Sequence, residues 1–143
     1  EEVKILTNLA ENFENEEIVK FSLCGEKLKL KKIMEENNFS SEDFFILQKI
    51  LSKKIHRLIK IKNLKKKEKN TEIVLNQIKP PIFWKEKDIV IRQVNIWELQ
   101  NLNDVINQLN QIELNAKKNY EMGVNITLDF LSNICHQANN SAL

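Results

Sequence analysis

The sequence predicts an all-α fold, a compact bundle of about six to eight helices. The 143 residues contain only two glycines and two prolines, too few turn residues for a sandwich or a barrel. Apolar residues recur three and four positions apart in several long stretches, whereas no stretch alternates with period two long enough for a strand. The length corresponds to about one domain, and such a chain buries roughly two-thirds of its unfolded surface.

The first part of the chain is expected to form three short helices. The apolar residues of positions 2–10 indicate one or two helical turns, which the acidic, Asn-rich stretch Asn12–Asn15 should interrupt. A second helix is predicted over Glu16–Cys24, and Gly25 stands where helices commonly end. The third should cover Glu26–Asn37, where two consecutive asparagines close it.

The longest helix of the first half is predicted from about Glu42 to Lys67. The segment Ser40–Asp43 resembles a capping box, with a hydroxyl and a carboxylate three residues apart. An apolar stripe recurs at helical spacing and should face the core: Phe44, Leu47, Leu51, Ile55 and Leu58. The remaining face carries polar and basic residues at the same spacing: Lys49, Lys53, His56, Lys60, Asn63 and Lys67.

The only two prolines are adjacent and mark a break in the middle of the chain. Proline lacks an N–H and disfavours helical conformation in the preceding residue, so no helix should cross Lys79–Pro81. A short helix over Thr71–Ile78 is expected before this hinge. Three large apolar residues follow it at once, Ile82, Phe83 and Trp84. We therefore expect the new segment to enter the core, with Trp84 packed there as Trp97 is.

Three helices are expected after the hinge. The first should cover Lys85–Trp97, and the second, the cleanest amphipathic pattern of the chain, runs from Leu99 to Tyr120 with Gly123 as its stop. The last helix should open near Asn125–Thr127. Residues 136–143 are expected to fray.

The sequence offers little to a catalytic mechanism. Two isolated glycines cannot build a phosphate loop, and two Cys and two His, with Cys135 beside His136, are a poor basis for a zinc site. The thiols Cys24 and Cys135 should be buried, as in a reducing, cytoplasmic setting. No apolar run approaches the roughly 18–20 residues of a membrane span. We therefore expect no enzyme, no cofactor, no metal and no membrane partner.

Positive charge is concentrated in the middle of the chain. Residues 49–92 carry fourteen basic and four acidic side chains, which leaves two interpretations open. The lysines form a solvated face and a basic loop, or they contact phosphates or an acidic protein surface. Because nearly all are lysines, base-specific bidentate readout is not expected. The candidate contacts are Lys49, Lys53, Lys60, Lys65, Lys66 and Lys67.

A second candidate contact lies at the end of the long C-terminal amphipathic helix. Tyr120 follows Lys117 and Lys118 closely, and an aromatic ring beside two cations could stack on an unpaired base. The alternative is that Tyr120 packs against the end of its own helix.

One family shows the same order of motifs. The order Pro81-Ile82-Phe83-Trp84-Lys85, a helix ending near Trp97, Leu102 with Leu109, the segment Glu113–Tyr120 and a final apolar helix resembles the C-terminal part of the delta subunit of the bacterial DNA polymerase III clamp loader. The first half agrees through Cys24–Lys27, Phe45–Leu51 and His56–Leu58. The resemblance covers essentially the whole chain, and the order and spacing of the motifs make it specific.

The resemblance implies a part in DNA replication. Members of that family are related to AAA+ proteins and do not hydrolyse ATP, and their helical third domains assemble into a collar. By analogy, residues 14–143 would be the collar domain and residues 1–13 the remnant of a lid domain. The expected partners are the other loader subunits and template or primer DNA near Tyr120, with the sliding clamp gripped only through a missing N-terminal domain. The alternative function is a small basic helical nucleic-acid-binding protein that uses the Lys49–Lys69 region.

Overall fold

The computed structural model describes the backbone of residues 2–142 and the side chains of residues 13–141. Within these residues the chain is all-helical and contains no strand. The predicted all-α bundle of six to eight helices is therefore confirmed. The elements are α1 (Glu2–Cys24), α2 (Lys27–Glu36), α3 (Asp43–Leu64), α4 (Thr71–Gln77), the 3₁₀ turn η1 (Trp84–Glu86), α5 (Lys87–Ile96), α6 (Leu99–Lys118), the 3₁₀ turn η2 (Tyr120–Met122) and α7 (Gly123–Ala142).

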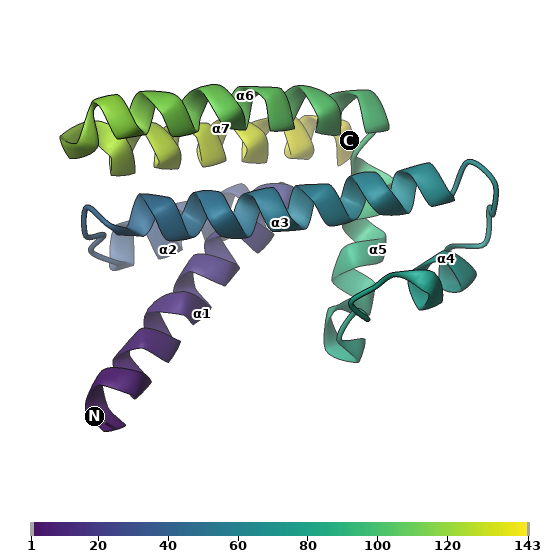
Figure 1. Ribbon diagram of the computed structural model, residues 1–143, viewed down its shortest axis with the longest axis horizontal. Coiled ribbons are helices and arrows are strands. Elements are labelled where there is room, and N and C mark those ends of the chain that lie inside the picture. Colours follow the sequence, from purple (N-terminus) through teal and green to yellow (C-terminus); the bar gives the residue numbers. More distant parts are fainter. Residues whose placement is uncertain (1, 143) are drawn as a thin grey trace.

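Helices α3, α6 and α7 form the body of the bundle (Figure 1). Helix α6 packs on α3 and α7, while α1 enters from one side and packs on α7 and α3 with its C-terminal half. Helix α5 crosses one end, and α4 lies at the periphery beside α3. The largest fully buried side chains among the described residues come from five different segments: Ile18, Leu23, Phe44, Leu47, Leu51, Ile55, Leu58, Ile61, Ile78, Trp97, Leu102 and Leu109.

The N-terminal segment is one helix, so the predicted interruption at Asn12–Asn15 is wrong. Asparagine and glutamate lower helix stability by only a few tenths of a kcal/mol each relative to alanine, and no glycine or proline stands in the segment. Asn15 is itself buried, which indicates that packing of the following turns extends the helix through this stretch. Helix α1 also runs without interruption across the expected domain boundary between Phe13 and Glu14.

Helix α1 ends at Gly25, as predicted. Gly25 has a φ of 71°, in the left-handed region that favours glycine. Its N–H donates to the Ser22 carbonyl at 3.3 Å and the Glu26 N–H donates to the Phe21 carbonyl at 3.0 Å, the two hydrogen bonds of a Schellman motif. The Leu23 carbonyl accepts from Nε1 of the buried Trp97 at 2.9 Å. These bonds pair carbonyls that a helix end otherwise leaves free.

An ion pair connects the start of α2 with α5. Arg92 Nη1 donates to Glu26 Oε1 at 2.7 Å. The hydrogen bond from Arg92 is the main reason why the pKa of Glu26 lies below its usual range, and it raises the pKa of Arg92 in turn. The pair holds the α1–α2 corner against α5, although Arg92 itself is exposed.

Half of the predicted capping box forms at the start of α3, where the N-cap residue Glu42 makes no side-chain hydrogen bond. The Asp43 carboxylate accepts from the Ser40 N–H at 2.7 Å and from the Ser40 hydroxyl at 3.2 Å, which is the backward-reaching half of a capping box. The helix then ends at Leu64, and Lys65–Lys67 form a turn. The predicted apolar stripe of Phe44, Leu47, Leu51, Ile55 and Leu58 is completely buried.

Of the three apolar residues after the prolines, Ile82 packs against the core, whereas the expectation that Phe83 and Trp84 enter it was wrong. Residues 78–83 contain no helix. Phe83 is 56% exposed and Trp84 is 72% exposed, whereas Trp97 is buried as predicted. Both prolines are also exposed. The core is already filled by α3 and α5, so these side chains project beside it, with their rings 5.9 Å apart between centroids.

Gly123 is not the stop of α6 but the first residue of α7. Helix α6 ends at Lys118, and the turn η2 intervenes. A Cβ atom at position 123 would lie 2.7 Å from ring atoms of Phe44. Close packing against Phe44, rather than helix termination, therefore favours glycine at position 123. The predicted start of the last helix near Asn125 is corrected to Gly123.

The C-terminal residues are helical to Ala142, so the expected fraying over residues 136–142 is wrong, and Leu143 lies outside the described residues. Ala138 is completely buried. Asn139 Nδ2 donates to the Gly25 carbonyl at 3.2 Å. These contacts fix the last turns of α7 against the end of α1.

Candidate nucleic-acid interface

The polar face of α3 and the turn after it form a basic strip, consisting of Lys49, Lys53, His56, Lys60, Asn63 and, in the turn, Lys67. The apolar stripe of the same helix is buried, and all six residues of the basic strip are exposed. At about 1.5 Å of rise per residue, Lys49 and Lys60 lie roughly 16 Å apart along the helix. Among the described side chains, none of these lysines pairs with a carboxylate. Their charges therefore remain available to an anionic partner.

The structure joins one end of the basic strip to the predicted contact on α6. Lys49 and Lys53 from α3 and Lys117 from α6 line one open hollow of about 490 Å³. Its other lining residues are Phe45, Gln48, Ser52 and Glu113. Three lysines against a single glutamate give this hollow a positive balance, which suits a phosphate group.

Tyr120 lies close to this hollow through an aromatic cluster. Its ring meets Phe44 edge-on at 5.3 Å between centroids and lies 6.0 Å from Phe45, which lines the hollow. Tyr120 nevertheless remains 43% exposed. The side chain is therefore anchored on one side by the bundle while part of the ring faces solvent, an arrangement that permits stacking on a base.

The remaining predicted lysines divide into two groups. Lys60 and Lys67 line a second open hollow of about 760 Å³ together with His56 and Asn63. Lys65, Lys66 and Lys118 line neither hollow. Lys66 and Lys118 are exposed, and Lys65 is half-buried at the end of α3.

Sequence reasoning missed two residues that shape the first hollow. Phe45 is 41% exposed; it lines the hollow together with Lys49, and its ring lies 6.0 Å from that of Tyr120. In the sequence, Phe45 could have been noticed as a large apolar residue one position away from Phe44, which belongs to the buried stripe. Gln48 is buried and donates to Thr127 Oγ1 at 3.0 Å, and Thr127 Oγ1 donates to the Gly123 carbonyl at 2.8 Å. This chain of hydrogen bonds fixes the base of the hollow to α7, and only tertiary structure reveals it.

The nucleophilic and metal-binding residue types are not gathered in this region. Cys24 and Cys135 are buried free thiols, as predicted, and burial raises the pKa of each. His56 is exposed and its Nδ1 lies 2.8 Å from the Ser52 carbonyl. Among the described side chains, no three Asp, Glu, His or Cys residues cluster as metal ligands would. The chemistry that the basic strip supports is the binding of anions by its lysine side chains.

Comparison of the chain with protein-family models, with curated proteins and with solved structures gave no match. In the described part of the chain, no helix has the length and apolar character needed to cross a bilayer. The fold and the site therefore define a class, an all-α helical bundle with one basic face.

Proposed function

We propose that this chain is a non-catalytic assembly domain, the collar domain of the delta subunit of a bacterial DNA polymerase III clamp loader. It acts in the cytoplasm during DNA replication. In this role it binds other loader subunits through its outer helix faces and positions an N-terminal domain that grips the sliding clamp. The parent subunit is an accessory part of the polymerase holoenzyme.

The observation that carries the proposal is that the residues of the family resemblance are parts of one helical bundle. Leu102 and Leu109 are buried on α6, and Trp97 is buried just before it, as a collar built from these helices requires. The outward face of α6 is rich in uncharged amides, including Asn103, Asn107 and Asn110, all exposed. Such a face is suited to hydrogen bonding with neighbouring helices at a protein interface.

The proposal is tested by co-expression of the chain with the other loader subunits of the same organism. The expected result is a stoichiometric complex that survives size-exclusion chromatography at micromolar concentration. A chain that elutes alone beside an assembled set of its proposed partners would contradict the collar role.

A second function, nucleic-acid binding without a protein partner, is favoured by the meeting of Lys49, Lys53 and Lys117 in one hollow near Tyr120. The lysines would neutralise phosphates, and Tyr120 would stack on a base of a single strand. Fluorescence anisotropy of a labelled single-stranded oligonucleotide and of a duplex measures both contributions.

The salt dependence separates the two functions. If three phosphates are neutralised at this hollow, log K for single-stranded DNA should fall with log salt with a slope of about −2. Lys53→Gln should reduce the magnitude of the slope by about 0.7, whereas Lys32→Gln, an exposed lysine on α2, should leave it unchanged. Absence of DNA binding at low salt would exclude this second function and leave the assembly role.

A further inference from the structure

We propose that the groove between α1, α3 and α5 is a docking site for a helical segment of a partner protein, which inserts one apolar side chain next to a carboxylate. The groove is separate from the basic strip and was not apparent in the sequence. The inference goes beyond the proposed function, because it does not depend on which assembly the chain joins.

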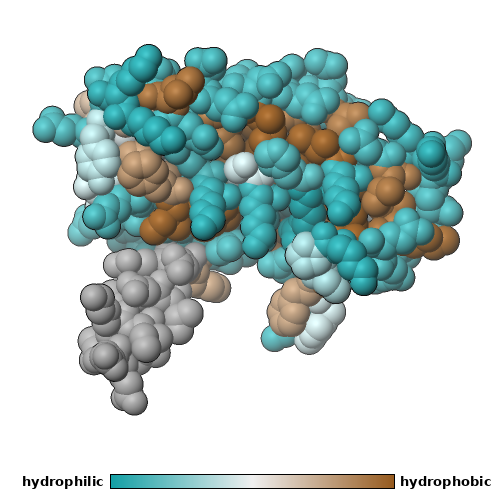
Figure 2. Space-filling view, viewed as in Figure 1, coloured by the Kyte–Doolittle hydropathy of each residue, from teal (hydrophilic) through white to brown (hydrophobic). Residues whose placement is uncertain are grey.

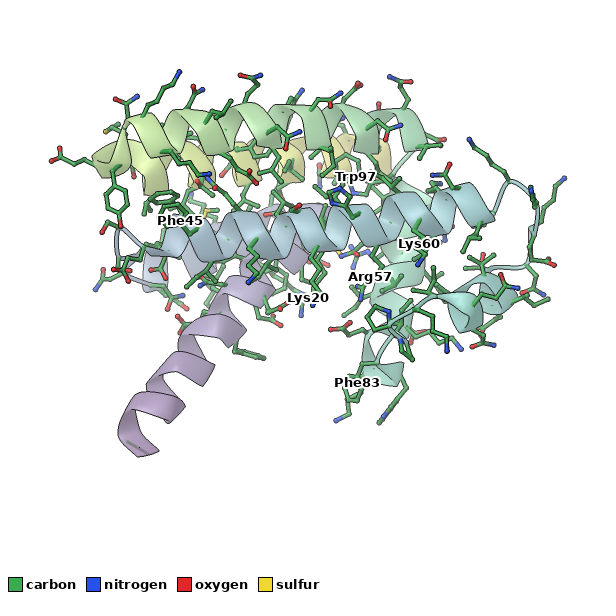
Figure 3. The ribbon with its side chains drawn as sticks, in the orientation of Figure 1. Lys20, Phe45, Arg57, Lys60, Phe83 and Trp97 are labelled. Carbon is green, nitrogen blue, oxygen red and sulfur yellow. The ribbon has the colours of Figure 1, made fainter. Side chains whose placement is uncertain are left out.

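The groove is a true hollow of about 380 Å³ with an apolar floor. Val19 and Leu23 of α1 and Val90 of α5 form this floor and are already buried. The volume is sufficient for one large apolar side chain of a partner. Figure 3 shows Lys20, Arg57 and Phe83 around this part of the molecule, with Phe83 at the tip of the segment that leads into α5.

Two exposed aromatic side chains, Phe13 and Phe83, line the groove, and Trp84 lies beside Phe83 with the ring centroids 5.9 Å apart. Phe13 on α1 is 66% exposed, and Phe83 and Trp84 on the opposite side are 56% and 72% exposed. Figure 2 shows this second side as pale and brown side chains projecting below the bundle near α5. Phe and Trp gathered around a hollow are typical of binding surfaces and are costly to leave in water.

The wall of the groove has more cationic than anionic groups. Lys20, Lys54, Arg57 and Lys85 face Glu16, Glu17 and Glu86. Glu86 lies 3.8 Å from Lys54 and 3.4 Å from Arg57, Glu16 lies 3.5 Å from Lys54, and Glu17 lies 2.7 Å from Lys20. Lys85 is therefore the lining cation that has no carboxylate partner among the described side chains. A carboxylate supplied by a partner would pair with Lys85 and balance the charge of the wall.

A small molecule would fill the hollow but would leave the aromatic side chains beside it in water. The occupant must therefore extend across both sides, as a protein segment does. Because no strand edge exists among the described residues, the groove offers no backbone pairing to an extended peptide. A helix satisfies its own backbone hydrogen bonds and can present an apolar residue and a carboxylate one turn apart on a single face.

The segment that carries Phe83 and Trp84 is suited to recognition. Pro80 and Pro81 precede it and have fixed φ angles, and Lys85 Nζ lies 5.4 Å from the centroid of Trp84. A preorganised loop loses less conformational entropy on binding than a flexible one.

The test uses the full chain and four synthetic alanine-rich helical peptides, each with Phe, Trp, Leu or Ile four residues before a Glu. Binding is measured by isothermal titration and by Trp fluorescence. We expect at least one peptide to bind with a dissociation constant below about 1 mM. Binding should weaken about tenfold when the peptide Glu is replaced by Lys, and about tenfold in Trp84→Ala.

Matched variants keep the test decisive. Trp84 and Phe83 are exposed, so Trp84→Ala and Phe83→Ala are expected to fold, which circular dichroism checks. Leu28→Ala removes an even more exposed apolar side chain, 85% exposed on α2 and outside this groove, and should bind as wild type does. No binding by any peptide at 1 mM, or equal binding by the Glu and Lys peptides, would overturn the proposal. Dimerisation of the free chain that Trp84→Ala abolishes would assign the groove to a second copy and overturn it as well.

Discussion

Gly25 is the position where a single methyl group should do the most damage to the fold. In Gly25→Ala the added Cβ would lie 2.6 Å from the backbone nitrogen of Asn139 and 2.9 Å from the Ala138 carbonyl carbon. These are atoms of the α7 backbone, which cannot rotate away as a side chain would. In addition, alanine in the left-handed region is unfavourable by about 1–2 kcal/mol.

The overpacking of a tight site adds about 1–3 kcal/mol, and the reduced entropy of the unfolded chain returns about 0.4–1 kcal/mol. We therefore expect Gly25→Ala to lower the free energy of unfolding by about 1–5 kcal/mol, measured by urea denaturation followed by circular dichroism. Since a domain of this kind has roughly 5–15 kcal/mol in all, the melting temperature should also fall clearly.

Two matched variants separate the causes. Asparagine tolerates the left-handed region better than alanine, so Gly25→Asn should recover part of the loss if backbone conformation dominates. It carries the same Cβ, however, and we expect it to lose at least half as much as Gly25→Ala. In Gly123→Ala the Cβ meets only the Phe44 ring, which can shift, so the loss should be smaller. A Gly25→Ala variant within 1 kcal/mol of wild type would refute this reasoning.

Three further predictions follow from the same structure. Trp97→Phe should lower the free energy of unfolding by about 2–4 kcal/mol, because a buried hydrogen bond and ring volume are lost together; a loss below 1 kcal/mol in a urea titration would contradict this. The pKa of Glu26 is depressed in the folded state, so its stabilisation should be present above its unfolded value of about 4.3 and vanish as the pH falls through the folded value. Arg92→Gln should thus lower the urea midpoint at pH 7 and not at pH 2.5, and an equal effect at both would disprove the link. Because burial raises the pKa of Cys24 and Cys135, both thiols should react with a disulfide reagent far more slowly at pH 7.5 than after unfolding in urea; rapid labelling of the native chain would contradict their burial.

Elements with a long, regular apolar period were predictable from the sequence. Helix α3 has its five striped residues buried and its capping carboxylate in place, because periodicity and capping are local signals. The helix end at Gly25 was predictable for the same reason. In each case neighbouring residues determine the outcome without help from the rest of the chain.

The errors arose where distant contacts decide. The Asn12–Asn15 stretch is helical because the turns of α1 that follow it pack in the core, with Asn15 itself buried. The last turns of α7 are ordered by their contact with Gly25. Gly123 looked like a helix stop, but the Phe44 ring accounts for it. Phe83 and Trp84 looked like core residues because hydrophobicity alone does not distinguish the interior from a surface that binds another protein.

The candidate site was predictable in part. Helical spacing was enough to place Lys49 and Lys53 on one outward face, since both lie on a single helix. The arrival of Lys117 beside them depends on how α6 crosses α3, and no local pattern gives that angle. The exposed ring of Phe45, which links these lysines to Tyr120, became meaningful only after that crossing was known.

The contact between the two ends of the chain has a consequence for its biosynthesis. The Cys135 thiol donates to the Phe21 carbonyl, 114 positions away in the sequence, so the surroundings of α1 are incomplete until α7 has been synthesised. A nascent chain on the ribosome should carry an unshielded α1 for several seconds, at about 5–20 residues per second. During that interval α1 is the segment most open to chaperones and proteases.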